Sequence, residues 1–368
     1  MSGCKIKIGI IGVGQIGKWH IENYSRIPGA ELVAAADVNA AELAAVAAKT
    51  RIPHTYEDFR EMLKREDIEA VDVCLHNNLH AHVTMAALAA GKHVYCEKPM
   101  AGSYADARAM HKAARKARLN LSIQLSTLFS KETRAAKLMI DSGRLGRLYH
   151  ARSTGFRRRG RPYVDGYGTS NFVQKEIASG GALYDMGVYH IAQLLYLLGL
   201  PEVESVSGKT YQEMDMNQAR KKKGKFNVEE LGLGFVKFAG GLTMDIIEAW
   251  AIHLNNLEGS SIVGSKGGLR LDPFSFHTTA DDMDMNATFD LGGADYRWHQ
   301  LGADGDAYDS PQHHWVAALQ GRVKLLPTDT IALQTMLISE AIYLSDKLGR
   351  EVRARDVEKA SKSTALRI

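Results

Sequence analysis

The chain has 368 residues, of which 45% are hydrophobic and 24% are charged, so it is long enough for about two ordinary domains and too apolar to be intrinsically disordered. Its 34 glycines follow no collagen-like period, its net charge of +4 gives little reason to bind a polyanion, and its apolar runs fall short of the roughly 20 residues needed to cross a membrane. Its three cysteines, Cys4, Cys74 and Cys96, are widely spaced without a C-x-x-C pair, which argues against a disulfide framework and indicates a cytoplasmic location.

Apolar β-branched runs alternate with helical patterns through the first third of the chain. Strands are expected over residues 5–11, 31–36, 70–75, 92–96 and 120–125, and helices over 15–27, 40–49, 57–64, 80–90 and 104–118. Strands that alternate with helices of this length indicate right-handed βαβ units on a parallel sheet. Residues 1–127 are therefore predicted to form an α/β domain with a doubly wound parallel sheet.

The remainder of the chain has a different texture. After a helix over 132–140, strand patterns follow at 148–153, 205–212, 232–238, 242–250 and 260–263, mostly without helices between them. This pattern predicts an α+β domain over residues 128–368, built on a large, mostly antiparallel open sheet. One face of that sheet has no obvious helical cover in the sequence, so we expect a homodimer or homotetramer.

A G-x-G-x-x-G sequence follows the first strand and opens the first helix. Asp37 comes 20 residues after its last glycine, at the end of the second strand. In this context the glycines allow the pyrophosphate of a dinucleotide to approach the helix N-terminus, and the carboxylate accepts from ribose hydroxyls. A carboxylate would repel a 2′-phosphate, so a Rossmann domain that binds NAD rather than NADP is predicted, with contacts from Gly12, Gly14, Gln15, Ile16, Gly17 and Asp37.

Lys98 follows a short strand within the sequence Cys96-Glu97-Lys98-Pro99. Pro99 ends the strand, which places the lysine at the carboxyl edge of the sheet, where open α/β sheets bind ligands. Its ammonium group could hold a hydroxyl or carbonyl oxygen and stabilise charge that develops there. The alternative, an ordinary solvated lysine, remains open on this evidence alone.

A third motif, GGALYDMGVYH, occupies residues 180–190 and runs into an apolar helical stripe at Ile191, Leu194, Leu195 and Leu198. His190 titrates in the range that suits proton abstraction from an alcohol. Asp185 lies five residues earlier, which is about 140° around a regular helix, so the spacing alone does not place both side chains in one pocket.

Together, the three motifs resemble those of the glucose–fructose oxidoreductase/inositol dehydrogenase/rhizopine catabolism (Gfo/Idh/MocA) family, and the resemblance extends over essentially the whole chain. It implies that Lys98, Asp185 and His190 act around the nicotinamide and a sugar-like substrate. It also implies cofactor contacts from Asn77, His80 and Glu97. His76 and Ser179 depart from the family's usual proline and glycine, and the arginine-containing turn common after residue 124 is missing.

A long irregular segment at about 156–175 precedes the third motif, and loops of this length are commonly binding loops or lids. Its candidate substrate contacts are Arg157, Tyr163, Tyr167 and Lys175, and plain surface is an equally open interpretation. The lysine run at 221–225 is expected to be a solvated loop between strands. Neither basic run has the aromatic platforms of a nucleic-acid site, and no set of histidines and cysteines has metal-ligand spacing, so no nucleic acid and no metal are expected.

These features predict an enzyme: an NAD(H)-dependent oxidoreductase that acts on a secondary alcohol of a sugar, cyclitol or glycoside, with glucoside C3 as one candidate position. Two alternatives stay open. One is an NAD-dependent glycosidase that works by transient oxidation and elimination, and the other is a non-enzymatic NAD-sensing regulator. The joint presence of Lys98, Asp185 and His190 argues against the regulator, because a pure binder needs no proton-transfer set.

Overall fold

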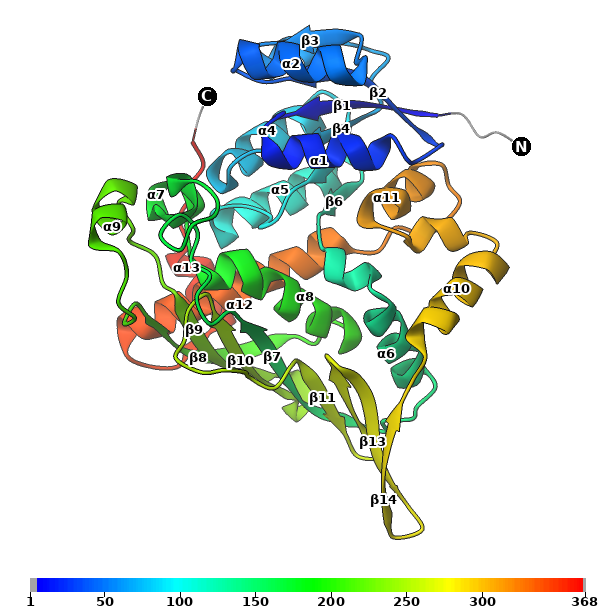
Figure 1. The fold of residues 1–368 in the computed structure, drawn as a ribbon, viewed down its shortest axis with the longest axis vertical. Coiled ribbons are helices and arrows are strands. Elements are labelled where there is room, and N and C mark those ends of the chain that lie inside the picture. The colour runs from blue at the N-terminus through cyan, green and yellow to red at the C-terminus, as the bar shows by residue number, and fades with distance from the viewer. Residues whose placement is uncertain (1–4, 367–368) are drawn as a thin grey trace.

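The computed structural model describes residues 5–366, and its first half is built on a six-stranded parallel sheet. The strand order is β3-β2-β1-β4-β5-β6, as expected for a doubly wound fold (Figure 1). Its strands are β1 (Ile6–Ile11), β2 (Ala30–Ala36), β3 (His54–Tyr56), β4 (Ala70–Val73), β5 (His93–Cys96) and β6 (Leu121–Ile123). The chain adds β2 and β3 on one side of β1 and β4, β5 and β6 on the other side, so the strand order reverses between β1 and β4. Ligands bind at such a switch point.

Five helices cover this sheet: α1 (Gln15–Tyr24), α2 (Ala40–Thr50), α3 (Phe59–Leu63), α4 (Asn77–Ala89) and α5 (Tyr104–Ala117). Their starts have local causes. The side chain of Asn39 accepts from the backbone N–H of Glu42 at the start of α2, and Ser103 caps α5 in the same way through Asp106. The strands are nearly continuous apolar runs because both faces of a parallel sheet are buried.

The second half is built on a nine-stranded sheet in the order β14-β13-β12-β11-β7-β10-β9-β8-β15. Its strands are β7 (Leu148–Phe156), β8 (Val203–Tyr211), β9 (Leu231–Phe238), β10 (Thr243–Ala249), β11 (Ser261–Gly264), β12 (Gly268–Leu271), β13 (Phe274–Ala280), β14 (Met283–Thr288) and β15 (Val352–Arg353). Strands β7 and β10 pair in parallel, and the other neighbours among the described residues are antiparallel. The expected open, mostly antiparallel sheet is confirmed.

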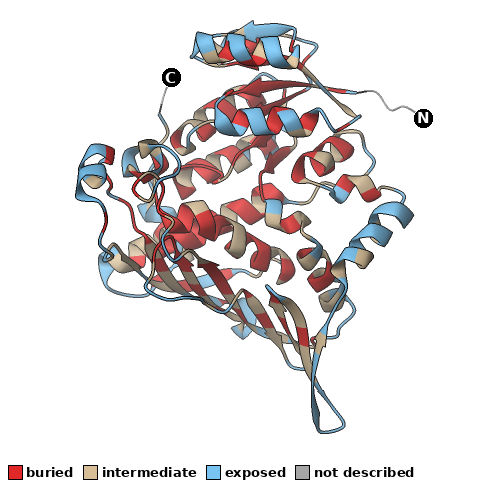
Figure 2. Ribbon diagram, viewed as in Figure 1, coloured by how far each residue is buried: buried red, intermediate tan, exposed pale blue. Residues whose placement is uncertain are grey.

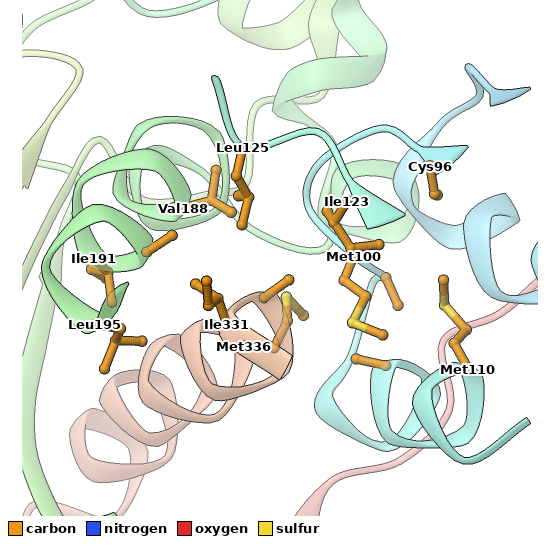
Figure 3. Close-up of a cluster of buried hydrophobic side chains, with 14 of the residues drawn as sticks. Cys96, Met100, Met110, Ile123, Leu125, Val188, Ile191, Leu195, Ile331 and Met336 are labelled. Atoms are coloured by element: carbon orange, nitrogen blue, oxygen red, sulfur yellow. The ribbon is translucent and has the colours of Figure 1, made fainter. Parts of the chain in front are cut away.

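Two helices, α8 (Val188–Leu197) and the long α12 (Thr328–Leu348), lie between this sheet and the first domain (Figure 1). Figure 2 shows both helices among the most buried parts of the molecule. Figure 3 shows how one core joins the two halves, with Met100 and Ile123 on one side, Ile191 of α8 and Ile331 and Met336 of α12 on the other. The helix that carries the third motif is therefore held from two directions.

The remaining helices are α6 (Lys131–Asp141), α7 (Lys175–Ala178), α9 (Gln218–Gly224), α10 (Leu291–Leu301), α11 (Pro311–Leu319) and α13 (Ala354–Ala360). Trp315 of α11 packs on Tyr95 of β5, so late segments also cover the first domain. The domain boundary at 127/128 stays a prediction. Within residues 5–366 no helix is long and apolar enough to span a bilayer. Cys74 and Cys96 are buried free thiols, and Cys4 lies outside the described residues.

The lysine run is largely exposed and lies between two strands, as predicted, but the prediction that it forms a loop is wrong. Residues 221–223 lie in α9, whose N-terminal N–H groups are capped by the side chain of Asn217, which accepts from Arg220. Lysines near a helix C-terminus are favourable for the helix dipole, so the charge run is compatible with a helix. The hairpin of β13 and β14 was also not expected, because β14 is largely polar and exposed.

Candidate active site

Of the three glycines in the turn after β1, only Gly14 has space for a side chain, whereas Gly12 and Gly17 have none. Gly12 has a φ of 94°, and a Cβ there would collide with the backbone oxygen of Cys74. A Cβ at Gly17 would collide with the backbone oxygen of Gly12, whereas nothing lies within 4 Å of a Cβ at Gly14. Gly12 and Gly17 therefore permit the turn and the close packing of α1, and Gly14 leaves its surface open.

The surroundings of this turn fit a dinucleotide. Among the described residues no side chain caps α1, so the N–H groups of its exposed first turn at Gln15 and Ile16 face outward with the positive end of the helix dipole. The carboxylate of Asp37 accepts from the backbone N–H of Val13 at 2.8 Å and from that of Asn39 at 2.9 Å. It is therefore fixed beside the glycine turn, where ribose hydroxyls would be recognised.

Lys98 lies at the carboxyl end of β5, facing the third motif. Its Nζ donates to the Asp185 side chain at 2.9 Å and to the Asp185 backbone oxygen at 3.0 Å, and it stands 4.7 Å from the ring centre of Tyr189. Burial opposes the ammonium charge, but Asp185, with smaller contributions from Tyr189 and Glu97, outweighs it, so the pKa of Lys98 is raised. Lys98 is therefore a charged donor at neutral pH.

The third motif contains a π-helical turn at Leu183–Gly187, directly before α8. A π-turn holds more residues than a regular turn, so the 140° separation estimated for a regular helix does not apply to Asp185 and His190. The end of β10 supplies a partner to each: Glu248 bonds His190, and Trp250 donates from Nε1 to Asp185 at 2.9 Å. Alternate residues of a strand share a face, so these partners bring the two side chains to one site.

Glu248 controls the orientation and charge of His190. Its carboxylate is fully buried and lies 3.0 and 3.2 Å from Nδ1 of the imidazole, while Ser153 donates to it at 3.1 Å. The carboxylate can only accept, so Nδ1 carries a proton and Nε2 is left for other chemistry. Burial lowers the pKa of His190, but the attraction of Glu248 is stronger and raises it overall.

The two glycines that open the motif are required by the close packing of Glu229 and Tyr343. Glu229 accepts from the backbone N–H groups of Gly181 and Leu183 and from the hydroxyl of Tyr343. A Cβ at Gly181 would collide with the backbone oxygen of Glu229, and one at Gly180 with the Tyr343 hydroxyl. Glu229 thus serves as the N-terminal cap of the π-turn that presents Asp185.

Two family models match the chain. One is described as an oxidoreductase family with an NAD-binding Rossmann fold and covers residues 6–125, and the other is the Gfo/Idh/MocA C-terminal domain at residues 133–270. The chain belongs to the Gfo/Idh/MocA family. It is an NAD-binding oxidoreductase, as the three motifs predicted.

Several members of the family are similar to this chain. D-glucoside 3-dehydrogenase of Escherichia coli is 30% identical over 286 residues, which cover 76% of this chain and 80% of that protein. Levoglucosan dehydrogenase of Pseudarthrobacter phenanthrenivorans is 27% identical, with 72% and 73% covered. A solved levoglucosan dehydrogenase, in complex with NADH and levoglucosan, superposes with a TM-score of 0.79 at 22% identity over 95% of this chain and 99% of that one.

A buried charge cluster supports the Glu-Lys-Pro motif from behind. His20 of α1 is fully buried, with Nδ1 2.7 Å from Asp72 and Nε2 2.9 Å from Glu97. The other oxygen of Glu97 accepts from the backbone N–H of Lys98 at 2.9 Å. Burial opposes the charge on His20, but Asp72 raises its pKa, so a protonated imidazole joins two carboxylates. Cys74 lies 3.3 Å from His20, and burial raises its pKa and keeps it a neutral thiol.

Asn77 and His80 bind backbone in this structure. The Asn77 amide donates to the Ala178 oxygen at 2.6 Å. His80 is fully buried, with its ring nitrogens 2.8 Å from the Pro99 oxygen and 3.0 Å from the Leu75 oxygen. Both side chains therefore hold backbone near the site, and their contacts with a cofactor stay a prediction.

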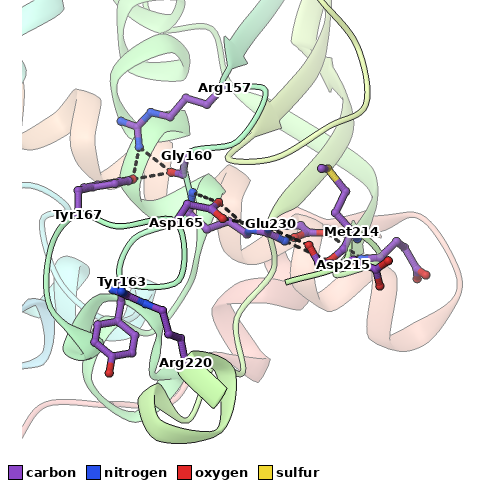
Figure 4. A network of polar contacts seen from close by, with 11 residues as sticks. Arg157, Gly160, Tyr163, Asp165, Tyr167, Met214, Asp215, Arg220 and Glu230 are labelled. Carbon is purple, nitrogen blue, oxygen red and sulfur yellow. Dashed lines mark hydrogen bonds and ion pairs between the residues drawn. The ribbon is translucent and has the colours of Figure 1, made fainter. Parts of the chain in front are cut away.

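The long segment before the third motif divides into an anchor and a site-facing part (Figure 4). Arg161 is fully buried between Asp165 and Glu230, at 2.8 Å from each, and fixes the segment to the sheet. Arg157 lies 3.5 Å from Asp185 and also bonds the hydroxyl of Tyr167.

The other two candidates lie elsewhere. The ring of Tyr163 faces Arg220, whose guanidinium is 4.8 Å from the ring centre (Figure 4). Lys175 is exposed, with Nζ 5.9 Å from the ring centre of Tyr343. The structure thus brings Arg157 and Tyr167 to the Lys98–Asp185 pair, and shows no such contact for Tyr163 or Lys175.

Proposed function

We propose that the protein is an NAD-dependent dehydrogenase that oxidises a secondary ring alcohol of a sugar, cyclitol or glycoside, with C3 of a glucoside as the first position to test. The observation that carries this proposal is the convergence of two prepared pairs on one site. Lys98 is paired with Asp185, and His190 is paired with Glu248. One pair supplies a charged donor and the other a proton acceptor, which is what alcohol oxidation requires.

In the oxidative direction, His190 takes the hydroxyl proton at Nε2 while Nδ1–H stays bonded to Glu248. Lys98 uses two of its three N–H donors on Asp185, and the third, on the side of Tyr189, is the one that a substrate oxygen can take. A bound NAD would supply the hydride acceptor for the carbinol carbon, held by the glycine turn and Asp37. The charge that develops on the oxygen is stabilised by Lys98 as the proton leaves.

Substrate orientation is a role for the rim of the site. Arg157 and Tyr167 bond each other beside Asp185, where they can bind further ring hydroxyls. Tyr167 is half-exposed, and burial together with nearby carboxylates raises its pKa to about 12, so it stays a neutral donor. A neutral hydroxyl and a guanidinium are suitable partners for polyol oxygens.

The direct test is a spectrophotometric screen for NAD reduction over inositols, hexoses, sugar acids and glycosides. We expect reduction with at least one class and its loss in Lys98→Ala. If no member of the panel reduces NAD, the proposal is wrong. Release of an aglycone with NAD that is recycled rather than consumed would instead assign the transient oxidation and elimination reaction.

We also propose that the protein works as a homodimer or homotetramer through the nine-stranded sheet. The face of this sheet away from α8 and α12 carries side chains such as Arg152, which bonds Asp245 at 2.7 Å. A self-complementary contact on this face would bury it. A mass corresponding to one chain in light scattering at micromolar concentration would exclude this assembly.

A further inference from the structure

We propose that His20 is a positioning residue for the oxidation: it bonds one oxygen of Glu97 and so leaves Asp185 as the partner of the Lys98 ammonium group. The inference rests on the proposed function, in which Lys98 acts on the substrate oxygen. Because the side chain of His20 is fully buried, it cannot touch the substrate and can act only through its neighbours.

The carboxylate of Glu97 has a different partner on each oxygen. Oε1 lies 2.9 Å from Nε2 of His20, and Oε2 accepts from the backbone N–H of Lys98 at 2.9 Å. Glu97 is only 6% exposed. The loss of either partner would therefore leave an unsatisfied buried oxygen, which is costly.

Glu97 and Asp185 are two carboxylates beside one ammonium group. Asp185 bonds Nζ of Lys98 at 2.9 Å. Burial opposes the charge of Lys98, but the attraction of Asp185, then of Tyr189 and of Glu97, raises its pKa. Burial alone would raise the pKa of Glu97, but His20 and, to a smaller extent, Lys98 hold it below its ordinary value. Glu97 is therefore a charged acceptor within electrostatic range of Nζ, and it is the alternative partner for that group.

The imidazole of His20 is held so that Nε2 faces Glu97. Its Nδ1 lies 2.7 Å from Asp72 of β4, whose other oxygen lies 3.4 Å from Sγ of Cys74. The ring also packs against that of Tyr95, with ring centres 5.9 Å apart. Since a carboxylate can only accept, a carboxylate at each ring nitrogen requires a proton on both, and the imidazole is a cation. His20 therefore supplies both a donor and a neutralising charge to Glu97.

Loss of the donor from His20 would change the preferred partner of Lys98. Oε1 of Glu97 would become a buried charged oxygen without a partner, and hydrogen bonds between ions are stronger than those between neutral groups. The Lys98 ammonium group can provide the missing donor by turning from Asp185 to Glu97. It would then no longer face the substrate oxygen, and a displacement of about 1 Å at a catalytic group can lower the rate by about 100-fold.

Two substitutions separate this role from simple support of the fold. His20→Asn places an amide nitrogen near the position of Nδ1, so it can donate to Asp72 but leaves Glu97 without its donor. His20→Gln places the amide nitrogen near the position of Nε2, so it can still donate to Glu97. Both variants lose the buried cation, and both should unfold at lower denaturant concentration. Only His20→Asn should lower kcat for alcohol oxidation by about 10- to 100-fold, whereas His20→Gln should stay within about threefold of the wild type.

A second change tests whether the charge of Glu97 is the cause. In the double variant His20→Asn/Glu97→Gln a neutral amide replaces the competing carboxylate, so kcat should recover by about tenfold over His20→Asn alone. A merely structural loss would not be repaired by a second buried substitution. NADH affinity, measured by calorimetry, should stay within about threefold of the wild type in both single variants, because the glycine turn and Asp37 are unchanged.

Crystal structures of the two single variants give a readout that needs no substrate. His20→Asn should show Nζ of Lys98 bonded to Glu97, and His20→Gln should show it bonded to Asp185. His93→Asn is the matched control, because it removes a half-buried histidine at the start of β5, where the ring accepts from the backbone N–H of Asn120. This control should leave kcat and the position of Lys98 unchanged.

Equal kcat in His20→Asn and His20→Gln would overturn the inference, and so would an Nζ of Lys98 that stays on Asp185 in the His20→Asn structure. The absence of any recovery in the double variant would also contradict it. The proposed function is judged separately by the NAD-reduction screen. If that screen finds no substrate, the proposed function fails, and the two crystal structures still decide whether His20 directs Lys98 to Asp185.

Discussion

The two sides of the active site are held in different ways. On the side of the first domain, the backbone N–H of Lys98 is bonded by Glu97. Glu97 belongs to a charge cluster whose imidazole, that of His20, is fully buried. On the side of the large sheet, His190 is 27% exposed and depends on one carboxylate, Glu248. The difference indicates a rigid donor on one side and, on the other, a base whose pKa and orientation depend on a single contact.

The largest effects are expected from removing the two groups themselves. Lys98→Ala and His190→Ala should each lower kcat/KM for alcohol oxidation by about 10²–10⁴, the usual scale for lost acid–base or charge-stabilising groups. NAD affinity, measured by calorimetry, should change little in His190→Ala, because His190 contacts Glu248 and the substrate side. Near-normal turnover in His190→Ala would place the base elsewhere.

The buried charge cluster of His20, Asp72 and Glu97, on the side of the first domain, is tested by the free energy of unfolding. His20→Ala leaves Asp72 and Glu97 buried without their shared cation, which should lower the free energy of unfolding by about 3–5 kcal/mol. Because the folded pKa of His20 is raised, its contribution is complete below about pH 6.5 and is lost as the pH rises through the folded value. Denaturant titrations across pH measure both effects.

The control for this variant is His299→Ala, which breaks an exposed pair with Asp309. Exposed ion pairs contribute about 0–1 kcal/mol, so this change should be small at every pH. A loss in His20→Ala no larger than that in His299→Ala would show that the buried cluster does not stabilise the first domain.

The dependence of His190 on Glu248, on the side of the large sheet, is tested by the pH profile of kcat/KM. Oxidation needs neutral His190, so kcat/KM should rise with pH through a pKa that Glu248 holds above its ordinary value. Glu248→Gln removes the negative charge, so the midpoint should move to lower pH, and the looser imidazole should lower the plateau by about 10- to 100-fold. Glu351→Gln, at an exposed pair with Lys237, is the control and should leave the profile unchanged. An unmoved midpoint in Glu248→Gln would disprove this role.

The two sides of the site also differ in how far the sequence predicts them. The glycine turn, Asp37 and the Lys98 edge were predictable because each has a local cause within one βαβ unit. Glu248 and Trp250 were not, because they meet His190 and Asp185 across sequence separations of 58 and 65 residues. An alternating Glu-Ala-Trp at the end of a predicted strand was the available signal, but the residue pattern does not indicate that these side chains face the helical third motif.

The π-turn was a second limit. The regular-helix geometry assumed for residues 180–190 separates Asp185 from His190, and nothing in the local residue pattern identifies a π-turn. Its cause lies in distant groups, since Glu229 caps its first N–H groups and Gly181 is the residue that fits beneath the Glu229 backbone. Strands β3 and β14 were not predicted for a simpler reason: β3 is short, β14 is polar, and neither has a buried apolar face.

The smallest predicted effect concerns the cofactor end of the rigid domain. The Asp37 carboxylate is fixed by the N–H groups of Val13 and Asn39, and the exposed neighbour Val38 supplies no cation for a 2′-phosphate. NAD should therefore be used at least about tenfold more efficiently than NADP, which corresponds to about 1.4 kcal/mol. Asp37→Ser removes the charge and should narrow that ratio, mainly by improving KM for NADP.

Asp37→Asn is the control, because it keeps the shape of the side chain and removes only its charge. If charge repulsion with the 2′-phosphate is what disfavours NADP, both variants narrow the ratio to a similar extent. Equal kcat/KM for the two cofactors in the wild type would show that Asp37 supports the glycine turn without discriminating at the ribose.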